Sequence, residues 1–386
     1  MVSDSKACID VILPTLGKNL DFLHESIDSV INQAETNKVF ICVDKQSRHK
    51  SELVASLNNY SPDKLKIIYS EHQGVGGALN AGLRASSAPY IARQDDDDIS
   101  EKYRFAKQLK LIQDYKAQLC FSALSLFDND GVDNLYTEIA HEAAENYFWI
   151  GSLLFGSTLN HATLLSENFY KKENIFYLET AAEDYNLWLR IAKSKKIYTT
   201  SERLYRYRQH ELQKTKNWVW TEIYAEVYPQ WEQICAEIIP RSKIDKKNTF
   251  NLIFDTVENQ SSKAVEDFLV LVECIVKNLI ESEQKNDERY WDYLIMRVSE
   301  IISKMGNAHK IEDYLKSRPK VDKDYLFDVF MRASIQLGNL KNKHNSLGEV
   351  SHKIRLDNQD LLQDNIELNK KFASRLINKV TGFFES

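Results

Sequence analysis

The sequence has no closely spaced cysteines. Its five cysteines, an odd number, are spread over 386 residues, and no two of them form a CxxC pair; they are Cys8, Cys42, Cys120, Cys235 and Cys274. Disulfide-rich secreted domains and zinc knuckles both need paired or clustered cysteines. The sequence therefore indicates neither class and favours a reducing compartment such as the cytoplasm.

Long apolar runs are also missing. A helix needs about 20 apolar residues to cross a bilayer. The most apolar helix candidate, residues 268–280, is interrupted by Glu273 and Lys277. The first apolar stretch follows Asp10 without a basic region before it, so we expect no signal peptide.

Positive charge is not in excess. The formal net charge is -6 and the sequence pI is about 5.9, whereas nucleic-acid-binding domains usually carry a basic stripe. We therefore expect no nucleic-acid partner and favour carbohydrate or small-molecule chemistry. Hydrophobic residues make up 43% of the chain, which is enough for a core, and 386 residues exceed one average domain.

Two kinds of pattern divide the chain. Up to about residue 215, short apolar runs rich in β-branched residues, at 8–14, 38–44 and 64–70, alternate with helical periodicity, which predicts an α/β domain with a largely parallel sheet. Beyond it, long helical patterns dominate and glycine becomes scarce. We predict an α/β domain over 1–215, an all-α extension over 216–343 and a coiled coil over 344–386.

Four consecutive aspartates, Asp95 to Asp98, follow the predicted strand 89–94. Ligands of open α/β sheets bind at the carboxyl ends of strands. In an extended segment Asp95 and Asp97 would face the same side, and two carboxylates suit Mg²⁺ or Mn²⁺ that also holds a diphosphate. The alternative is a solvated acidic turn that caps a helix starting near Ser100.

Five segments then occur in a recognisable order: VILPTLG, ICVDKQS, HQGVGGALNAGL, PYIARQDDDDI and AAEDYNLWLRI. Together they resemble the family-2 glycosyltransferases of the GT-A fold, over residues 8–215. The resemblance implies a Rossmann-like mixed sheet, a nucleotide-sugar donor such as a UDP-sugar, Mg²⁺ or Mn²⁺, and inversion at the anomeric carbon.

The resemblance also implies a donor site. It puts Pro14 and Thr15 at the nucleotide, Asp44 near the uracil, Asp95 at the ribose and Asp97 on the metal. The remaining residues assigned to nucleotide-sugar binding are Gly74, Asn80, Arg93, Asp96 and Arg208.

Some of these positions leave alternatives open. Lys45 and Gln46 depart from the family pattern, which often has a second acidic residue followed by glycine. Asn80 either reaches the nucleotide or makes a packing contact. The segment GVGGALNAG is a tight donor-site turn and not a dinucleotide fingerprint, because GxGxxG would need glycine at Leu79.

Inverting transfer also needs a base for the acceptor hydroxyl. Asp184 matches the family's catalytic aspartate, and Glu183 either orients it or binds acceptor hydroxyls. An acidic pair favoured by the dipole of a helix N-terminus is the alternative. His161 matches a family position where donor and acceptor meet, although a lone histidine is often structural.

The segment 203–214 places Arg206, Arg208 and His210 at alternating positions, and therefore on one side of an extended chain. Such a row suits a diphosphate. By resemblance, His210 joins the metal shell or contacts the leaving group. A solvated basic strand edge is the other interpretation.

The C-terminal segment has two patterns. Leucine or isoleucine recurs every seventh residue from Leu347 to Leu368, with Asn358 and Asn365 at intervening positions, which is typical of a parallel dimeric coiled coil. After it, apolar residues from Phe372 to Phe384 fall on one helical face among lysines and arginines. We predict a homodimer held peripherally at the inner face of the cell membrane by this helix.

The resemblance to family-2 glycosyltransferases therefore implies a metal-dependent inverting hexosyl- or N-acetylhexosaminyl-transferase. The expected acceptor is a growing glycan of a bacterial surface polysaccharide, such as lipopolysaccharide or capsule, or the lipid-linked precursor of that glycan. One alternative is a sugar-phosphate nucleotidyltransferase, which we disfavour because no glycine-rich, lysine-containing loop follows the first strand. A degenerate GT-A domain that acts as an oligomeric scaffold is the other.

Overall fold

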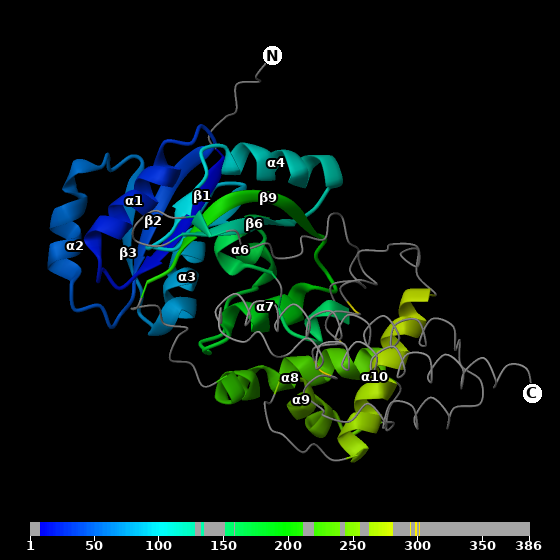
Figure 1. Ribbon diagram of the computed structural model, residues 1–386. Coiled ribbons are helices and arrows are strands. Elements are labelled where there is room, and N and C mark those ends of the chain that lie inside the picture. Colours follow the sequence, from blue (N-terminus) through cyan, green and yellow to red (C-terminus); the bar gives the residue numbers. More distant parts are fainter. Residues whose placement is uncertain are drawn as a thin grey trace, which may run out of the picture.

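The computed structural model describes residues 8–127, 133–134, 151–157, 159–210, 220–239, 244–254 and 262–280, with residues 294, 298 and 301 (Figure 1). The predicted coiled coil and basic amphipathic helix over 344–386 lie outside these residues. Among the described helices, none is both long and apolar enough to span a membrane.

The N-terminal part is built on one mixed sheet. Its nine strands are β1 (Ile9–Thr15), β2 (Thr36–Val43), β3 (Leu65–Tyr69), β4 (Tyr90–Arg93), β5 (Ile99–Ser100), β6 (Leu119–Phe127), β7 (Asp133–Asn134), β8 (Leu165–Glu167) and β9 (Ile197–Arg208). The order is β3-β2-β1-β4-β8-β6-β9-β5, with β7 paired to β6. The first four strands are parallel, and β8 is antiparallel to both β4 and β6. The predicted mixed α/β sheet is confirmed.

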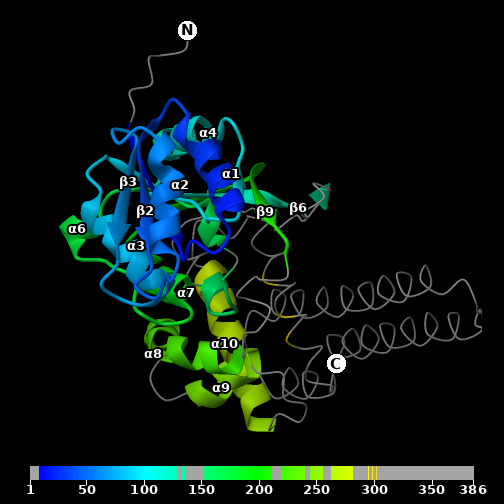
Figure 2. The same ribbon diagram turned by 90° about the vertical axis from the view of Figure 1, so that its left-hand side faces the viewer.

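Helices connect these strands and cover both faces of the sheet (Figures 1 and 2). They are α1 (Leu20–Ile31), α2 (Lys50–Ser56), α3 (Gly74–Ala85), α4 (Arg104–Tyr115), α6 (Tyr170–Glu173) and α7 (Glu183–Ile191), with two short 3₁₀ turns, η1 (Leu57–Asn59) and η2 (His161–Thr163). Helix α1 begins where the Asn19 side chain accepts a hydrogen bond from the Phe22 N–H, as an N-cap residue does.

The central strand β1 shows why the strand runs are apolar at consecutive positions. Val11 and Leu13 belong to the hydrophobic cluster that includes residues of α1, α2 and α4, whereas Ile12 belongs to the cluster of α3 and α7. Successive side chains of a strand point to opposite faces, so a strand covered on both sides must be apolar throughout. On the second face α3 lies close to the sheet, because a Cβ at Gly82 would come within 2.6 Å of Cys42 Sγ.

The helical extension shares a core with the α/β part. It begins with α8 (Trp220–Ile238), α9 (Lys246–Phe254) and α10 (Ser262–Ile280), which lie below α7 in Figure 1. Trp231 is fully buried, and its indole Nε1–H donates to the Leu154 carbonyl at 2.9 Å. In the described residues one continuous hydrophobic cluster runs from β1 and α3 through α7 to α10. The helices therefore support the side of the domain that carries α7.

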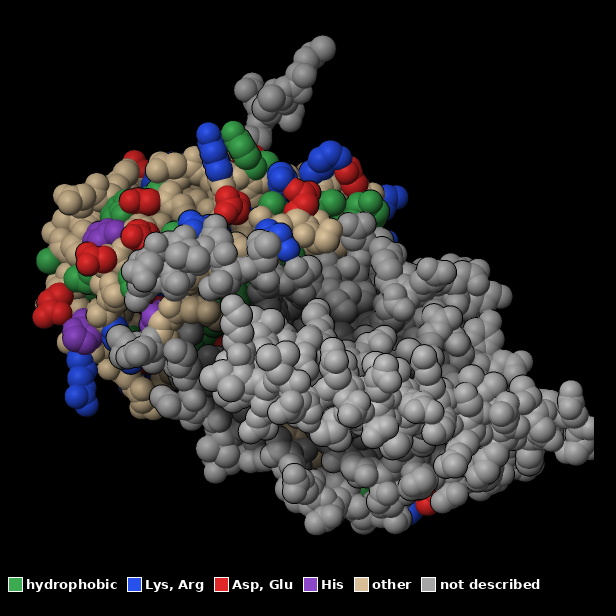
Figure 3. Space-filling view, in the orientation of Figure 1, with side chains coloured by type: hydrophobic (Ala, Val, Ile, Leu, Met, Phe, Trp, Pro, Cys, Tyr) green, Lys and Arg blue, Asp and Glu red, His purple; other side chains and the backbone are tan. Residues whose placement is uncertain are grey.

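Figure 3 shows one face of the molecule in space-filling form. On the described α/β part of this face, acidic, basic and histidine side chains are interspersed.

Candidate functional site

The four aspartates form a turn directly after β4. The strand ends at Arg93, and residues 96 and 97 lie in the turn, so the segment is not the extended one that alternation assumed. Each carboxylate therefore has its own partner: Asp95 contacts the Arg93 guanidinium at 2.7 Å, Asp96 the Thr15 hydroxyl at 2.5 Å, Asp97 the His210 Nε2 at 2.8 Å, and Asp98 the Arg208 backbone N–H at 2.8 Å. The turn brings together residues from β1, β4 and the end of β9.

Negative charge accumulates in this turn. Burial and the neighbouring Asp97 charge raise the pKa of Asp96 to about 7, against the hydrogen bond from Thr15 that favours its ionised form. Burial, with the charges of Asp97 and Asp95, also raises the pKa of Asp98 well above its ordinary value. A bound cation would relieve this repulsion, because it favours the ionised form of every carboxylate around it.

Asp97 and His210 are the pair best placed to hold such a cation. Their Oδ2 and Nε2 atoms are 2.8 Å apart. Neighbouring ligands of an octahedral ion with bonds of about 2.1 Å lie roughly 3 Å apart, and Mg²⁺ usually takes one or two carboxylates plus phosphate oxygens and waters. Within the described ranges no group of three or more His, Cys, Asp or Glu side chains is arranged to hold a metal. The pair fits a cation that substrate phosphates complete.

Arg208 is hydrogen-bonded to the aspartate turn. Its guanidinium lies over the rings of Phe22 and Phe127, at 4.1 and 4.5 Å from their centroids, and its Nε–H donates to the Asp97 carbonyl at 2.8 Å. It also forms an ion pair with Glu25. Arg206 lies over the same Phe127 ring at 4.5 Å. The predicted alternation along β9 therefore does place both arginines on one side.

A buried polar network lies behind the turn. Arg104 is fully buried, and its guanidinium donates to Gln108, Gln94, Ser100 and the carbonyls of Ala162 and Leu164. These bonds satisfy all five N–H donors of the side chain. Burial lowers the pKa of Arg104 to about 10. Gln94 directly precedes the aspartates and Ala162 directly follows His161. Arg104 on α4 is therefore hydrogen-bonded both to the aspartate segment and to the segment of His161.

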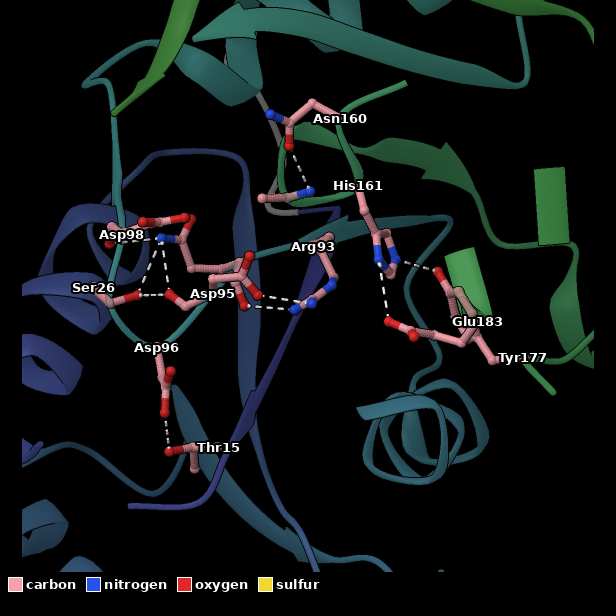
Figure 4. A network of polar contacts seen from close by, with 12 residues as sticks. Thr15, Ser26, Arg93, Asp95, Asp96, Asp98, Asn160, His161, Tyr177 and Glu183 are labelled. Atoms are coloured by element: carbon pink, nitrogen blue, oxygen red, sulfur yellow. Dashed lines mark hydrogen bonds and ion pairs between the residues drawn. The ribbon is translucent and has the colours of Figure 1, made fainter. Parts of the chain in front are cut away.

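The second part of the site is centred on His161. Its Nε2 lies 2.8 Å from the Tyr177 hydroxyl, and its Nδ1 lies 3.9 Å from Glu183 Oε1. In Figure 4 Arg93 lies between this group and the aspartate turn. Burial, and then the Arg93 charge, lower the pKa of His161 well below its ordinary value, so the imidazole is neutral at pH 7.

Asp184 lies in the first turn of α7. Its Oδ1 accepts a hydrogen bond from the Tyr185 N–H at 2.6 Å. Burial raises the pKa of Asp184, although this hydrogen bond and the Arg93 charge act in the opposite direction. A carboxylate whose pKa is raised is a stronger proton acceptor. The structure thus brings His161 to within 3.9 Å of Glu183, the residue that precedes Asp184 in α7.

The remaining predicted donor-site residues lie at the same sheet edge. Pro14 and Thr15 end β1, and Thr15 contacts the aspartate turn. Asp44 follows β2 and accepts a hydrogen bond from the Gln46 N–H at 2.7 Å, which shapes its own turn. Gly74 begins α3 with a φ of +83°, a conformation that favours glycine.

Asn80 makes a specific packing contact. Its Nδ2–H donates to the Tyr177 carbonyl and its Oδ1 accepts from the Tyr177 N–H, both at 2.9 Å. Both polar ends of the amide are thus used within the protein. Of the two roles left open by the sequence, this geometry favours the packing contact.

Tyr177, Gln94 and Arg104 were not among the predicted site residues. Tyr177 lies in an irregular segment between α6 and α7. Such a segment has no periodic pattern from which the orientation of a side chain could be predicted. Gln94 directly precedes the aspartates, and this position was the sequence feature that could have marked it as a site residue. Arg104 and Gln108 lie four residues apart on α4, a spacing that puts them on one helix face.

Comparisons with known proteins give a family match for part of the chain. Residues 10–185 match the family model described as glycosyl transferase family 2. The chain is 25% identical over 216 residues to an uncharacterized glycosyltransferase of Rickettsia typhi, which covers 54% of this chain and 65% of that protein. It is 27% identical over 214 residues to an uncharacterized glycosyltransferase of Methanocaldococcus jannaschii, covering 53% of this chain and 71% of that protein.

Among solved structures, residues 1–349 of S. aureus TarS in complex with UDP-GlcNAc are similar, with a TM-score of 0.48 and 15% sequence identity over 87% of this chain and 92% of that chain. The match to the family model covers every predicted site residue except Arg208 and His210. The chain therefore carries a glycosyl transferase family 2 domain over residues 10–185.

Proposed function

We propose that the chain transfers a sugar from a UDP-sugar to a hydroxyl group of a glycan acceptor, with inversion at the anomeric carbon. The observation that carries this proposal is that two groups lie near Arg93, which pairs with Asp95 of the aspartate turn and whose charge also acts on Asp184. One group is the Asp97–His210 pair at 2.8 Å, and the other is the Asp184 carboxylate on the family-2 domain. The first suits a metal diphosphate and the second an attacking hydroxyl.

The roles of the side chains follow from their chemistry. Asp97 and His210 would hold Mg²⁺ or Mn²⁺, which supplies positive charge for the departing diphosphate. Asp184 accepts the proton of the acceptor hydroxyl as that oxygen attacks the anomeric carbon. Arg93 forms an ion pair with Asp95, and in Figure 4 it lies between that aspartate and the group of His161 and Glu183. It therefore adds a fixed positive charge between the donor and acceptor sides.

The acceptor we propose is a bacterial surface glycan, such as lipopolysaccharide or capsule, or its lipid-linked precursor, and the sugar is a hexose or N-acetylhexosamine. A sugar-phosphate nucleotidyltransferase and a scaffold without activity remain the competing functions. The three functions differ in what they release. Only a glycosyltransferase releases UDP from a UDP-sugar when a glycan acceptor is present, and a scaffold releases nothing.

The metal assignment is tested by calorimetric titration of UDP with and without Mn²⁺. Asp97→Ala should abolish the Mn²⁺-dependent part of UDP binding, because it removes one of the two protein ligands. Asp114→Ala is the matched control, since Asp114 is an Asp on α4 that pairs with exposed Lys110. Metal-enhanced UDP affinity in Asp97→Ala would contradict the assignment. UDP release from UDP-glucose or UDP-N-acetylglucosamine tests the activity itself.

We propose in addition that residues 344–386 form a dimeric coiled coil that ends in a membrane-binding helix. The support is the heptad pattern and the basic amphipathic pattern of the sequence. A chain ending at Lys343 should lose the dimer in light scattering. A chain ending at Asn369 should lose co-sedimentation with anionic liposomes. An unchanged mass in the first or equal lipid binding in the second contradicts that part of the proposal.

A further inference from the structure

Tyr177 is a buried residue next to the proposed acceptor side of the site, and it has no role in the mechanism so far. It is 5% exposed. Its backbone N–H and carbonyl are both bonded to the Asn80 side chain at 2.9 Å, which fixes the segment to α3. Its hydroxyl lies 2.8 Å from His161 Nε2. The Tyr177 side chain is therefore held against one particular atom of the histidine.

The surroundings of His161 determine which ring nitrogen carries the proton. Nδ1 faces the Glu183 carboxylate, which can only accept hydrogen bonds when ionised. Burial and the nearby Arg93 keep the imidazole neutral, so it has a single N–H. Placing that proton on Nδ1 suits Glu183 and leaves Nε2 as an acceptor. Burial raises the pKa of Tyr177 well above its ordinary value, so its hydroxyl keeps the proton that it donates to Nε2.

Packing holds the ring in this orientation. The imidazole meets the indole of Trp188 edge-on, with ring centroids 5.6 Å apart at 84°, and lies tilted against the Tyr177 ring at 5.2 Å. Trp188 is fully buried. Rotation of the imidazole would therefore require movement of the core, so the direction of the Nδ1–H bond is fixed.

The distance from Nδ1 to the carboxylate matches one hydroxyl group. At 3.9 Å the two atoms are too far apart for a direct hydrogen bond. A hydroxyl oxygen at about 2.8 Å from each would accept from Nδ1–H and donate to Glu183. Asp184, the proposed base, is the next residue in the first turn of the same helix.

We propose that Tyr177 is a positioning residue: it holds His161 in the Nδ1–H tautomer, so that this N–H and the Glu183 carboxylate together bind one hydroxyl group of the acceptor sugar. The hydroxyl site rests on the proposed function. The tautomer does not, because it is a property of the free protein.

The tautomer is tested by ¹⁵N NMR of the histidine rings, with the His161 signals assigned from their loss in His161→Gln. Wild type should show a neutral ring that is protonated on Nδ1. In Tyr177→Phe, which keeps the ring and the backbone bonds to Asn80, the proton should redistribute to Nε2 or the ring should become charged. Tyr170→Phe is the control, because that buried hydroxyl contacts Ser166 and not His161. A proton on Nε2 in wild type, or an unchanged state in Tyr177→Phe, overturns the proposal.

The hydroxyl site is tested by steady-state kinetics of UDP release. Tyr177→Phe should lower kcat/KM for the acceptor roughly 10-fold, the equivalent of about 1.4 kcal/mol for one hydrogen bond. The Kd of UDP with Mn²⁺ should stay within about twofold, as it should in Tyr170→Phe. An equal loss of UDP affinity overturns the hydroxyl site. If wild type releases no UDP, the proposed function fails together with the hydroxyl site, while the NMR result still decides the role of Tyr177.

Discussion

The contact between Asn80 and Tyr177 allows a stability change to be worked from the structure. Asn80→Ala removes two hydrogen bonds of 2.9 Å and leaves the N–H and carbonyl of Tyr177, a residue that is 5% exposed, without these partners. Each buried polar group left unpaired costs about 1–3 kcal/mol, so the two together cost about 2–6 kcal/mol. Water that reaches the groups reduces this cost, and we expect the unfolding free energy to fall by about 3 kcal/mol.

The assay is urea unfolding followed by tryptophan fluorescence, together with calorimetric titration of UDP. Asn58→Ala is the matched control, because Asn58 is exposed and surface substitutions usually change stability by less than about 0.5 kcal/mol. If Asn80 acts through packing, Asn80→Ala should also bind UDP with nearly wild-type affinity at a temperature where it is folded. A stability loss below about 1 kcal/mol combined with a large loss of UDP affinity would refute this reasoning and restore the nucleotide role.

Two further predictions concern titratable groups. Asp184→Asn should lower the rate of transfer by roughly 10²-fold to 10⁴-fold, the usual contribution of a general base, with UDP binding unchanged; near-normal turnover would exclude Asp184 as the base. His161 has a lowered pKa in the folded state, so the unfolded state binds more protons and this group removes stability as the pH falls below about 6.5. His161→Gln should therefore make the unfolding free energy less steep between pH 6.5 and 5, by up to about 1.4 kcal/mol per pH unit, as measured by urea unfolding at several pH values. An unchanged slope would contradict the buried neutral state.

Sequence patterns predicted the α/β domain because its causes are local. A strand covered on both faces must be apolar at consecutive positions, as β1 is, and a helix must repeat its apolar residues with a period near 3.6. The edge that carries the site was also predictable. Asp95 to Asp98, Asp44 and Thr15 all stand where a strand ends, and parallel strands end at the same edge.

Family resemblance then placed individual roles on residues far apart in the chain. Asp97 and His210 were both assigned to the metal, and the structure puts them 2.8 Å apart across 113 residues of sequence. Likewise Glu183 and His161 were assigned to one part of the site, and they lie 3.9 Å apart. No periodicity in the sequence contains this information, because neither pair lies within a single described helix or strand.

Only the tertiary structure decided what surrounds these groups. The sequence pattern predicted an extended segment with Asp95 and Asp97 on the same side. In the structure the four aspartates form a turn, and each contacts a different partner. Asn80 bonds to Tyr177, 97 residues away, and Arg104 joins Gln94 to the segment after His161. The residue types determine which groups can donate or accept hydrogen bonds. Which of them meet depends on the packing of helices and loops against the sheet, and that is a property of the whole folded chain.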